Sequence, residues 1–121
     1  MSGHRRERVA EEMREQVATL VARELKDPRI GFVTITRVEV SADFSHAKVY
    51  FSVLGDEKQK RDSLVGLTKA AGFVRREVGR RMRMRVLPDV HFVYDKGVDA
   101  TDRVARLLDE VHARDDERGE D

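Results

Sequence analysis

The residues with the clearest chemical potential are the bases of one short segment. Between Lys69 and Arg85 the sequence carries seven basic residues and a single acid, Glu77. Six of the seven are arginine, whose planar guanidinium group forms bidentate hydrogen bonds with phosphate. The alternative is an ordinary solvated helix face. The shortage of acids for pairing along a helix favours phosphate binding instead.

A helical projection gathers part of this segment on one side. At about 100 degrees per residue, four bases fall within an arc of roughly 60 degrees, opposite an apolar stripe. The four bases are Lys69, Arg76, Arg80 and Arg83, and the stripe is Leu67, Ala71, Val74 and Val78. Gly72 and Gly79 border the arc and leave room for a sugar-phosphate backbone. We therefore predict an RNA-binding face here.

Further bases are weaker candidates for the same interface. Arg75, Arg81 and Arg85 point away from the arc if the helix is regular, yet they belong to the same basic segment. Arg5 and Arg6 open the first predicted helix and can add a second phosphate contact, or form a solvated basic end. Three aromatic residues could stack on bases, although a core with so few aromatics needs most of them: Phe32, Phe44 and Tyr50.

Composition narrows the other functions. The chain has 121 residues, no cysteine and a net charge of +1, which conceals the basic segment and an acidic end with seven acids from Asp109 onward. The four histidines have no metal-ligand spacing, and phosphate-binding loops and nucleophile motifs are absent. We expect no enzyme activity, metal, cofactor, small-molecule substrate or membrane association, and a monomer in the cytoplasm.

The elements that must position these residues follow from hydrophobic periodicity. We predict helix at 6–26, strands at 32–40 and 47–54 forming an antiparallel hairpin, and a polar loop at 57–62. A helical stripe at 64–82 follows, with a bend at Gly72, then a strand at 90–94 and a last helix from Asp99 or Thr101 to Ala113. The expected fold is one α+β domain over 1–113, with a charged, disordered tail at 114–121.

These segments together carry a resemblance. The motif Asp27-Pro28-Arg29, the stretches 33–41, 47–50, 82–88 and 92–95, and the joint Ala70-Ala71-Gly72-Phe73 resemble the bacterial ribosome-binding factor A family. The resemblance implies a type II K-homology fold: a three-stranded mixed sheet with helices on one face, and a bent helix whose Ala-x-Gly joint contacts the nucleic-acid backbone. Ala70 and Gly72 fill that joint. The segment 96–103 departs from the family pattern, so no site residue is taken from it.

The resemblance also implies a function. It predicts a ribosome assembly factor that binds the immature small ribosomal subunit and its rRNA, near the 5′ terminal helix and the decoding region. Late subunit maturation, rRNA processing and cold adaptation are the implied processes. The alternative is an adaptor that binds other proteins through its basic face and acidic tail and contacts rRNA only secondarily.

Overall fold

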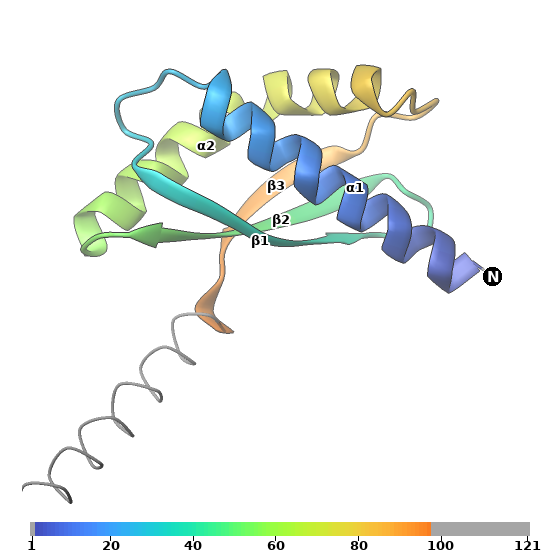
Figure 1. The fold of residues 1–121 in the computed structure, drawn as a ribbon, viewed down its shortest axis with the longest axis horizontal. Coiled ribbons are helices and arrows are strands. Elements are labelled where there is room, and N and C mark those ends of the chain that lie inside the picture. Colours follow the sequence, from blue (N-terminus) through green and yellow to red (C-terminus); the bar gives the residue numbers. More distant parts are fainter. Residues whose placement is uncertain (1, 98–121) are drawn as a thin grey trace, which may run out of the picture.

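A computed structural model describes residues 2–97 and shows five elements (Figure 1). They are α1 (Ser2–Arg23), β1 (Phe32–Val40), β2 (His46–Leu54), α2 (Glu57–Arg81) and β3 (Asp89–Tyr94). This order confirms the predicted sequence of helix, strand, strand, helix and strand. The last helix predicted for 99–113 and the tail at 114–121 lie outside the described residues.

The three strands form one mixed sheet in the order β1-β2-β3. β1 pairs with β2 antiparallel, and β2 pairs with β3 parallel, as predicted. In β2, Ala47, Val49, Phe51 and Val53 are buried, whereas His46 and Lys48 are exposed, because successive side chains of a strand point to opposite faces. The parallel pair requires a crossover connection, and α2 provides it.

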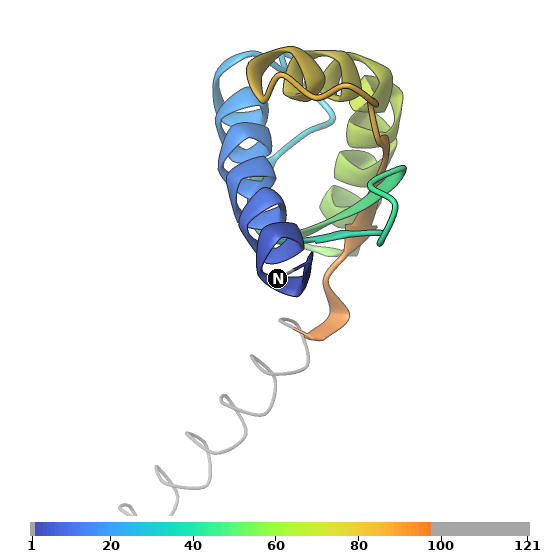
Figure 2. The ribbon, with the colours of Figure 1, turned by 90° about the vertical axis from the view of Figure 1, so that its right-hand side faces the viewer.

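Both helices lie on the same face of the sheet (Figures 1 and 2). α1 packs mainly on β1, and α2 packs mainly on β3. The core lies between these layers, and its buried cluster includes Val17 and Leu20 of α1, Val74 and Val78 of α2, and Phe51 of β2. The apolar stripe predicted for α2 therefore faces the sheet, although Ala71 is only half-buried.

α1 differs from its predicted bounds at both ends, since it begins at Ser2 and ends at Arg23 rather than spanning 6–26. Its last turn widens, because the amide of Leu25 donates to the carbonyl of Leu20. The next residues form a turn in which the amide of Ile30 donates to the carbonyl of Asp27, and Pro28 takes the position that proline favours. The chain must leave the helix early to enter this turn.

The predicted loop at 57–62 is wrong, because α2 already begins at Glu57. Asp56 and Gln59 form a capping box: the Gln59 amide donates to Asp56 Oδ1 at 2.8 Å, and the Asp56 amide donates to Gln59 Oε1 at 2.7 Å. α2 then runs as one helix to Arg81. Its ribbon changes direction between the green first half and the yellow second half, so α2 is bent within one continuous helix (Figure 1).

Candidate nucleic-acid interface

Three of the predicted bases share the exposed side of α2. Lys69, Arg76 and Arg80 are exposed, and so is Gly72 between them; we call these four residues the α2 basic face. Within residues 2–97, Lys69 and Arg76 form no ion pair. Arg80 donates to Glu77 Oε1 at 2.7 Å, which lowers the pKa of Glu77, but the Arg80 side chain remains 68% exposed. A surface pair of this kind stabilises a fold little, so phosphate can compete for the guanidinium group.

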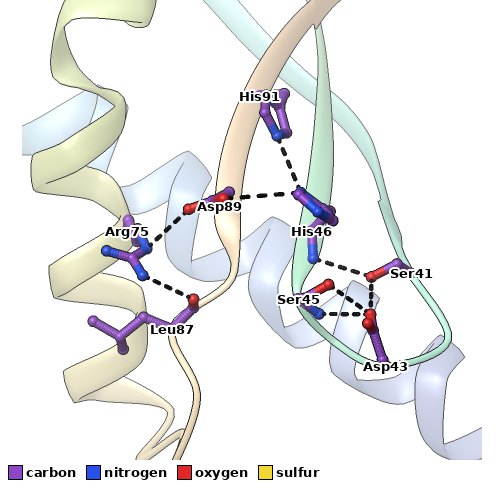
Figure 3. Close-up of polar contacts among 8 residues, drawn as sticks. All are labelled: Ser41, Asp43, Ser45, His46, Arg75, Leu87, Asp89 and His91. Carbon is purple, nitrogen blue, oxygen red and sulfur yellow. Dashed lines mark hydrogen bonds and ion pairs between the residues drawn. The ribbon is translucent and has the colours of Figure 1, made fainter.

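Arg75 faces the other way and is tied to the fold (Figure 3). Its Nη2 donates to the carbonyl oxygen of Leu87 at 3.2 Å, and its Nε lies 3.4 Å from Asp89 Oδ1. These contacts join α2 to the start of β3. The Arg75 Nε is buried and forms no hydrogen bond of good geometry. Arg75 therefore holds the start of β3 against α2. Because these contacts occupy its guanidinium group, Arg75 is a poor candidate for binding RNA phosphates.

Arg81 also has structural partners. Its Nη2 donates to Glu24 at the end of α1, and its Nε lies 3.5 Å from Glu77 Oε1. The side chain is only 23% exposed. Arg81 thus connects the ends of the two helices, and the seven bases of the segment are not equally available to a ligand.

The glycines of α2 have different surroundings. A Cβ on Gly72 would meet only Arg76 Nη1, at 3.5 Å, so an approaching backbone finds open space there. A Cβ on Gly79 would lie 1.8 Å from Leu87 Cδ2. The prediction that Gly79 borders the RNA-binding arc is wrong, since Gly79 is buried to let the α2–β3 connection pack closely. Ala70 is half-buried against the core and contributes to packing more than to the surface.

Arg83 does not belong to the helical arc predicted for it. α2 ends at Arg81, Met82 caps it, and Arg83 has a φ of 54 degrees, in the left-handed region. The amide of Met84 donates to the Gly79 carbonyl at 2.9 Å and that of Arg83 to the Arg80 carbonyl, the Schellman pattern that ends a helix. The prediction assumed a regular helix through position 83, and this cap overturns it. Arg83 and Arg85 are exposed in the connection to β3.

The two N-terminal arginines, Arg5 and Arg6, lie in different surroundings. Arg5 faces a groove between α1, the β1–β2 turn and the α2–β3 connection, whose lining also includes Arg83 and Arg85. Its guanidinium carbon lies 5.0 Å from the centre of the Phe44 ring. Arg6 lies on the neighbouring side, beside Val38 and Glu39 of β1. Six of the predicted bases therefore occupy two regions: Lys69, Arg76 and Arg80 lie on the α2 basic face, and Arg5, Arg83 and Arg85 line this groove. Arg6, Arg75 and Arg81 belong to neither region.

The three aromatic residues that could stack on bases differ in their surroundings. The Tyr50 hydroxyl donates to Glu39 Oε1 at 2.9 Å, and the Arg37 guanidinium lies over the Tyr50 ring at 3.7 Å. Phe32 is 80% exposed and contributes little to the core. Phe44 is half-buried beside Arg5, and sequence reasoning left it out of the site because the core was expected to need it. Its place in the turn 41–45, next to a predicted strand end, was the available signal.

Residues 2–97 also bear on metal binding and on membrane insertion. His46 and His91 lie side by side on β2 and β3, with 3.4 Å between His46 Nδ1 and His91 Nε2 (Figure 3). Even so, no group of three or more potential ligands in the described part of the chain is arranged to hold a metal ion. Over the same residues, neither helix combines the length and apolar character needed to cross a bilayer.

Comparison with known proteins decides the family. The family model described as ribosome-binding factor A matches residues 5–108. The chain belongs to the ribosome-binding factor A family. A relative of that name from Desulfitobacterium hafniense is 51% identical over 108 residues, covering 89% of this chain and 86% of the relative.

Solved structures support the same assignment. The crystal structure of ribosome-binding factor A from Thermus thermophilus matches with a TM-score of 0.66 at 27% identity, covering 74% of this chain and 94% of that one. A homology model of the Thermus thermophilus factor, fitted into a cryo-EM map of a 30S complex, matches with a TM-score of 0.59 at 28% identity, covering 69% of this chain and 88% of that one. The α+β architecture with a mixed sheet is thus that of the ribosome-binding factor A family, whose fold is K-homology-like.

Proposed function

We propose that this chain binds the small ribosomal subunit as an assembly factor and performs no chemistry. The observation that carries the proposal is the α2 basic face, where Lys69 and Arg76 have no ion-pair partner within residues 2–97 and Gly72 leaves space for a close approach. Membership of the ribosome-binding factor A family supports the identity of the target. So does the Thermus thermophilus relative that has been fitted into a 30S complex.

The finer proposal concerns place and timing. We infer that the chain contacts rRNA near the 5′ terminal helix and the decoding region, during late subunit maturation and rRNA processing, and leaves before translation. It acts as a monomer in the cytoplasm. The resemblance of the joint at Ala70-Ala71-Gly72 to the family pattern supports contact with the RNA backbone at the bend of α2.

Backbone contacts imply recognition of shape rather than of sequence. Structured RNA presents phosphates and 2′-hydroxyls in a fixed geometry, whereas base edges in its deep groove are hard to reach. If the chain neutralises about four to six phosphates, a plot of log affinity against log salt concentration should have a slope of about −3 to −5. A flat salt titration against purified small subunits would contradict the proposal.

The decisive experiment reverses charge on the α2 basic face. Arg76→Glu with Arg80→Glu should abolish association with immature small subunits in a sedimentation assay, while the thermal unfolding curve stays cooperative. Lys58→Glu with Arg61→Glu is the matched control, since it makes the same charge change on an exposed part of the first half of α2. Equal loss in both variants would indicate a general electrostatic effect, and wild-type binding by the first would refute the site.

The adaptor alternative predicts a different result. It requires the acidic residues after Ala113 to engage another protein, so deleting them should remove subunit binding. Under the rRNA-binding proposal the truncated chain binds as well as the full chain or more tightly, because acidic residues repel RNA. The comparison needs the same subunit preparation and salt concentration for both chains.

A further inference from the structure

The groove beside the β1–β2 turn has the dimensions of a ligand site. It is a cavity of about 470 Å³ bounded by the first turns of α1, the turn between β1 and β2, and the connection from α2 to β3. We call it the hairpin groove, defined by Arg5, Val9, Phe44, Met82, Arg83 and Arg85. The three segments that bound it lie at the end of the molecule that faces the viewer in Figure 2. Its volume falls in the range of pockets that bind small organic groups.

The hairpin groove combines an apolar floor with a cationic rim. Val9, Phe44 and Met82 are half-buried and pack against the core, so they form a floor rather than mobile surface side chains. Arg83 and Arg85 are exposed and form no ion pair within residues 2–97. Two acids also line the groove, Glu12 and Asp43. Asp43 accepts hydrogen bonds from the hydroxyls of Ser45 and Ser41 at 2.6 and 2.8 Å, which hold its carboxylate in the turn (Figure 3). The three guanidinium groups therefore outnumber the two carboxylates by one.

Backbone strain is concentrated at the same place. Within residues 2–97, Phe44 and Arg83 are the non-glycine residues with positive φ, at 60 and 54 degrees, and both line the hairpin groove. Such conformations cost free energy and cluster at functional sites. Glycine would fit the helix-capping position of Arg83 at lower energy. An arginine there points to a use for its guanidinium group.

We propose that the hairpin groove binds one unpaired base of single-stranded RNA, with the adjoining phosphates on Arg83 and Arg85. This rests on the proposed function, which supplies rRNA as the partner. The Arg5 guanidinium already lies over the Phe44 ring at 5.0 Å. A base can take this position on the ring by stacking, and Arg5 is then released toward a phosphate. The cationic rim favours RNA over an apolar peptide, which would gain nothing from three guanidinium groups.

The test compares the affinities of the wild type and of a Phe44 variant for two RNAs, one with bases and one without, as in a double-mutant cycle. Binding of a labelled single-stranded hexanucleotide is measured by fluorescence anisotropy, alongside a hexanucleotide in which every base is removed. Phe44→Ala should weaken binding of the first RNA about 5- to 150-fold, the range expected for one stacked base, and leave the second unchanged. Equal weakening of both RNAs, no weakening of either, or failure of the base-containing RNA to bind the wild-type chain would overturn the proposal.

Phe44→Ala could also disturb the turn, so two further variants separate binding from folding. Phe44→Leu keeps apolar volume and removes the aromatic face, and should lose most of the base-dependent affinity. Arg83→Gly should raise the melting temperature by relieving the positive φ and still weaken binding several-fold, whereas Arg83→Lys keeps the charge and most of the affinity. Arg83→Gly with unchanged affinity would count against the groove.

The outcomes also distinguish this inference from the proposed function. Subunit binding that is lost on reversing Arg76 and Arg80 but is indifferent to Phe44→Ala and Phe44→Leu would leave the proposed function intact and refute the groove. No subunit binding by the wild-type chain would refute the proposed function itself. If the Phe44 variants lose affinity for an isolated ribosomal protein and not for RNA, the groove binds an apolar side chain and the base proposal is overturned.

Discussion

Replacing Gly72 or Gly79 by alanine tests the exposed side and the packed side of α2 separately, because Gly72 is exposed and Gly79 is buried. Neither Gly72 nor Gly79 has a positive φ, so alanine fits the backbone at both positions. Alanine stabilises a helix interior by about 1 kcal/mol relative to glycine. A methyl group on Gly72 meets only Arg76 Nη1 at 3.5 Å, an ordinary contact. Gly72→Ala should therefore raise the free energy of unfolding by about 1 kcal/mol and the melting temperature by about 4 °C.

Gly79→Ala should have the opposite effect on stability. Its methyl group would lie 1.8 Å from Leu87 Cδ2 and 3.2 Å from Leu87 Cγ, so the Leu87 side chain must leave its position against α2. Overpacking of this kind costs about 1–3 kcal/mol, which exceeds the gain in helix propensity and leaves a net loss of up to about 2 kcal/mol. Thermal and urea unfolding followed by circular dichroism measure both changes.

The same two variants report on RNA binding. If the RNA backbone approaches α2 at Gly72, the added methyl group lies in its path, and Gly72→Ala should bind small subunits more weakly although it is more stable. Loss of stability in Gly72→Ala would show that the bend of α2 requires glycine, contrary to the geometry. An equal gain in stability for both variants would refute the assigned packing role of Gly79.

Three further predictions concern charged groups. Hydrogen bonds from Ser45 and Ser41 lower the pKa of Asp43 from 3.8 to about 2, so its carboxylate stabilises the fold above about pH 4 and this contribution is lost as the pH falls toward 2. The melting-temperature gap between the wild type and Asp43→Ala should be constant from about pH 5 to 8 and close below about pH 4. Arg75→Gln should lose about 1 kcal/mol or more of stability with little change in subunit affinity, and Arg76→Gln should do the reverse, as unfolding and sedimentation assays would show. A double-mutant cycle of Arg81→Gln and Glu24→Gln should give a coupling energy below about 1 kcal/mol, and a larger value would mean that the pair organises the helix ends.

Sequence patterns predicted the sheet well because its signals are local. β1 covers Phe32–Val40 as predicted, since a run of β-branched residues has few alternatives to an extended strand. The parallel pairing of β2 with β3 followed from chain connectivity, because a helical segment separates them. The capping box at Asp56 and Gln59 was an equally local signal, and it was missed in favour of a polar loop.

Local sequence patterns could not predict which arginine side chains are free to bind a ligand and which are held by partners within the fold. Arg75 and Arg81 are held by Asp89 and Glu24, which are distant in sequence and close only in the folded chain. A helical projection places side chains around one axis and contains no information about neighbouring elements. It also continues through position 83, where the left-handed backbone of Arg83 has already ended the helix.

The distribution of partners among the bases bears on how the chain can select its target. Carboxylates on neighbouring elements neutralise Arg75 and Arg81, so the basic segment presents far less free charge than its composition suggests. A chain with a net charge of +1 then has weak long-range attraction for RNA in general. Under the two proposals made above, tight binding comes from a target that fits the α2 basic face and the hairpin groove at the same time. A folded rRNA with an unpaired base at the right distance from a phosphate backbone fits both sites. A random single strand offers a base for the hairpin groove but no fixed backbone for the α2 basic face, and a regular duplex offers the backbone but no unpaired base.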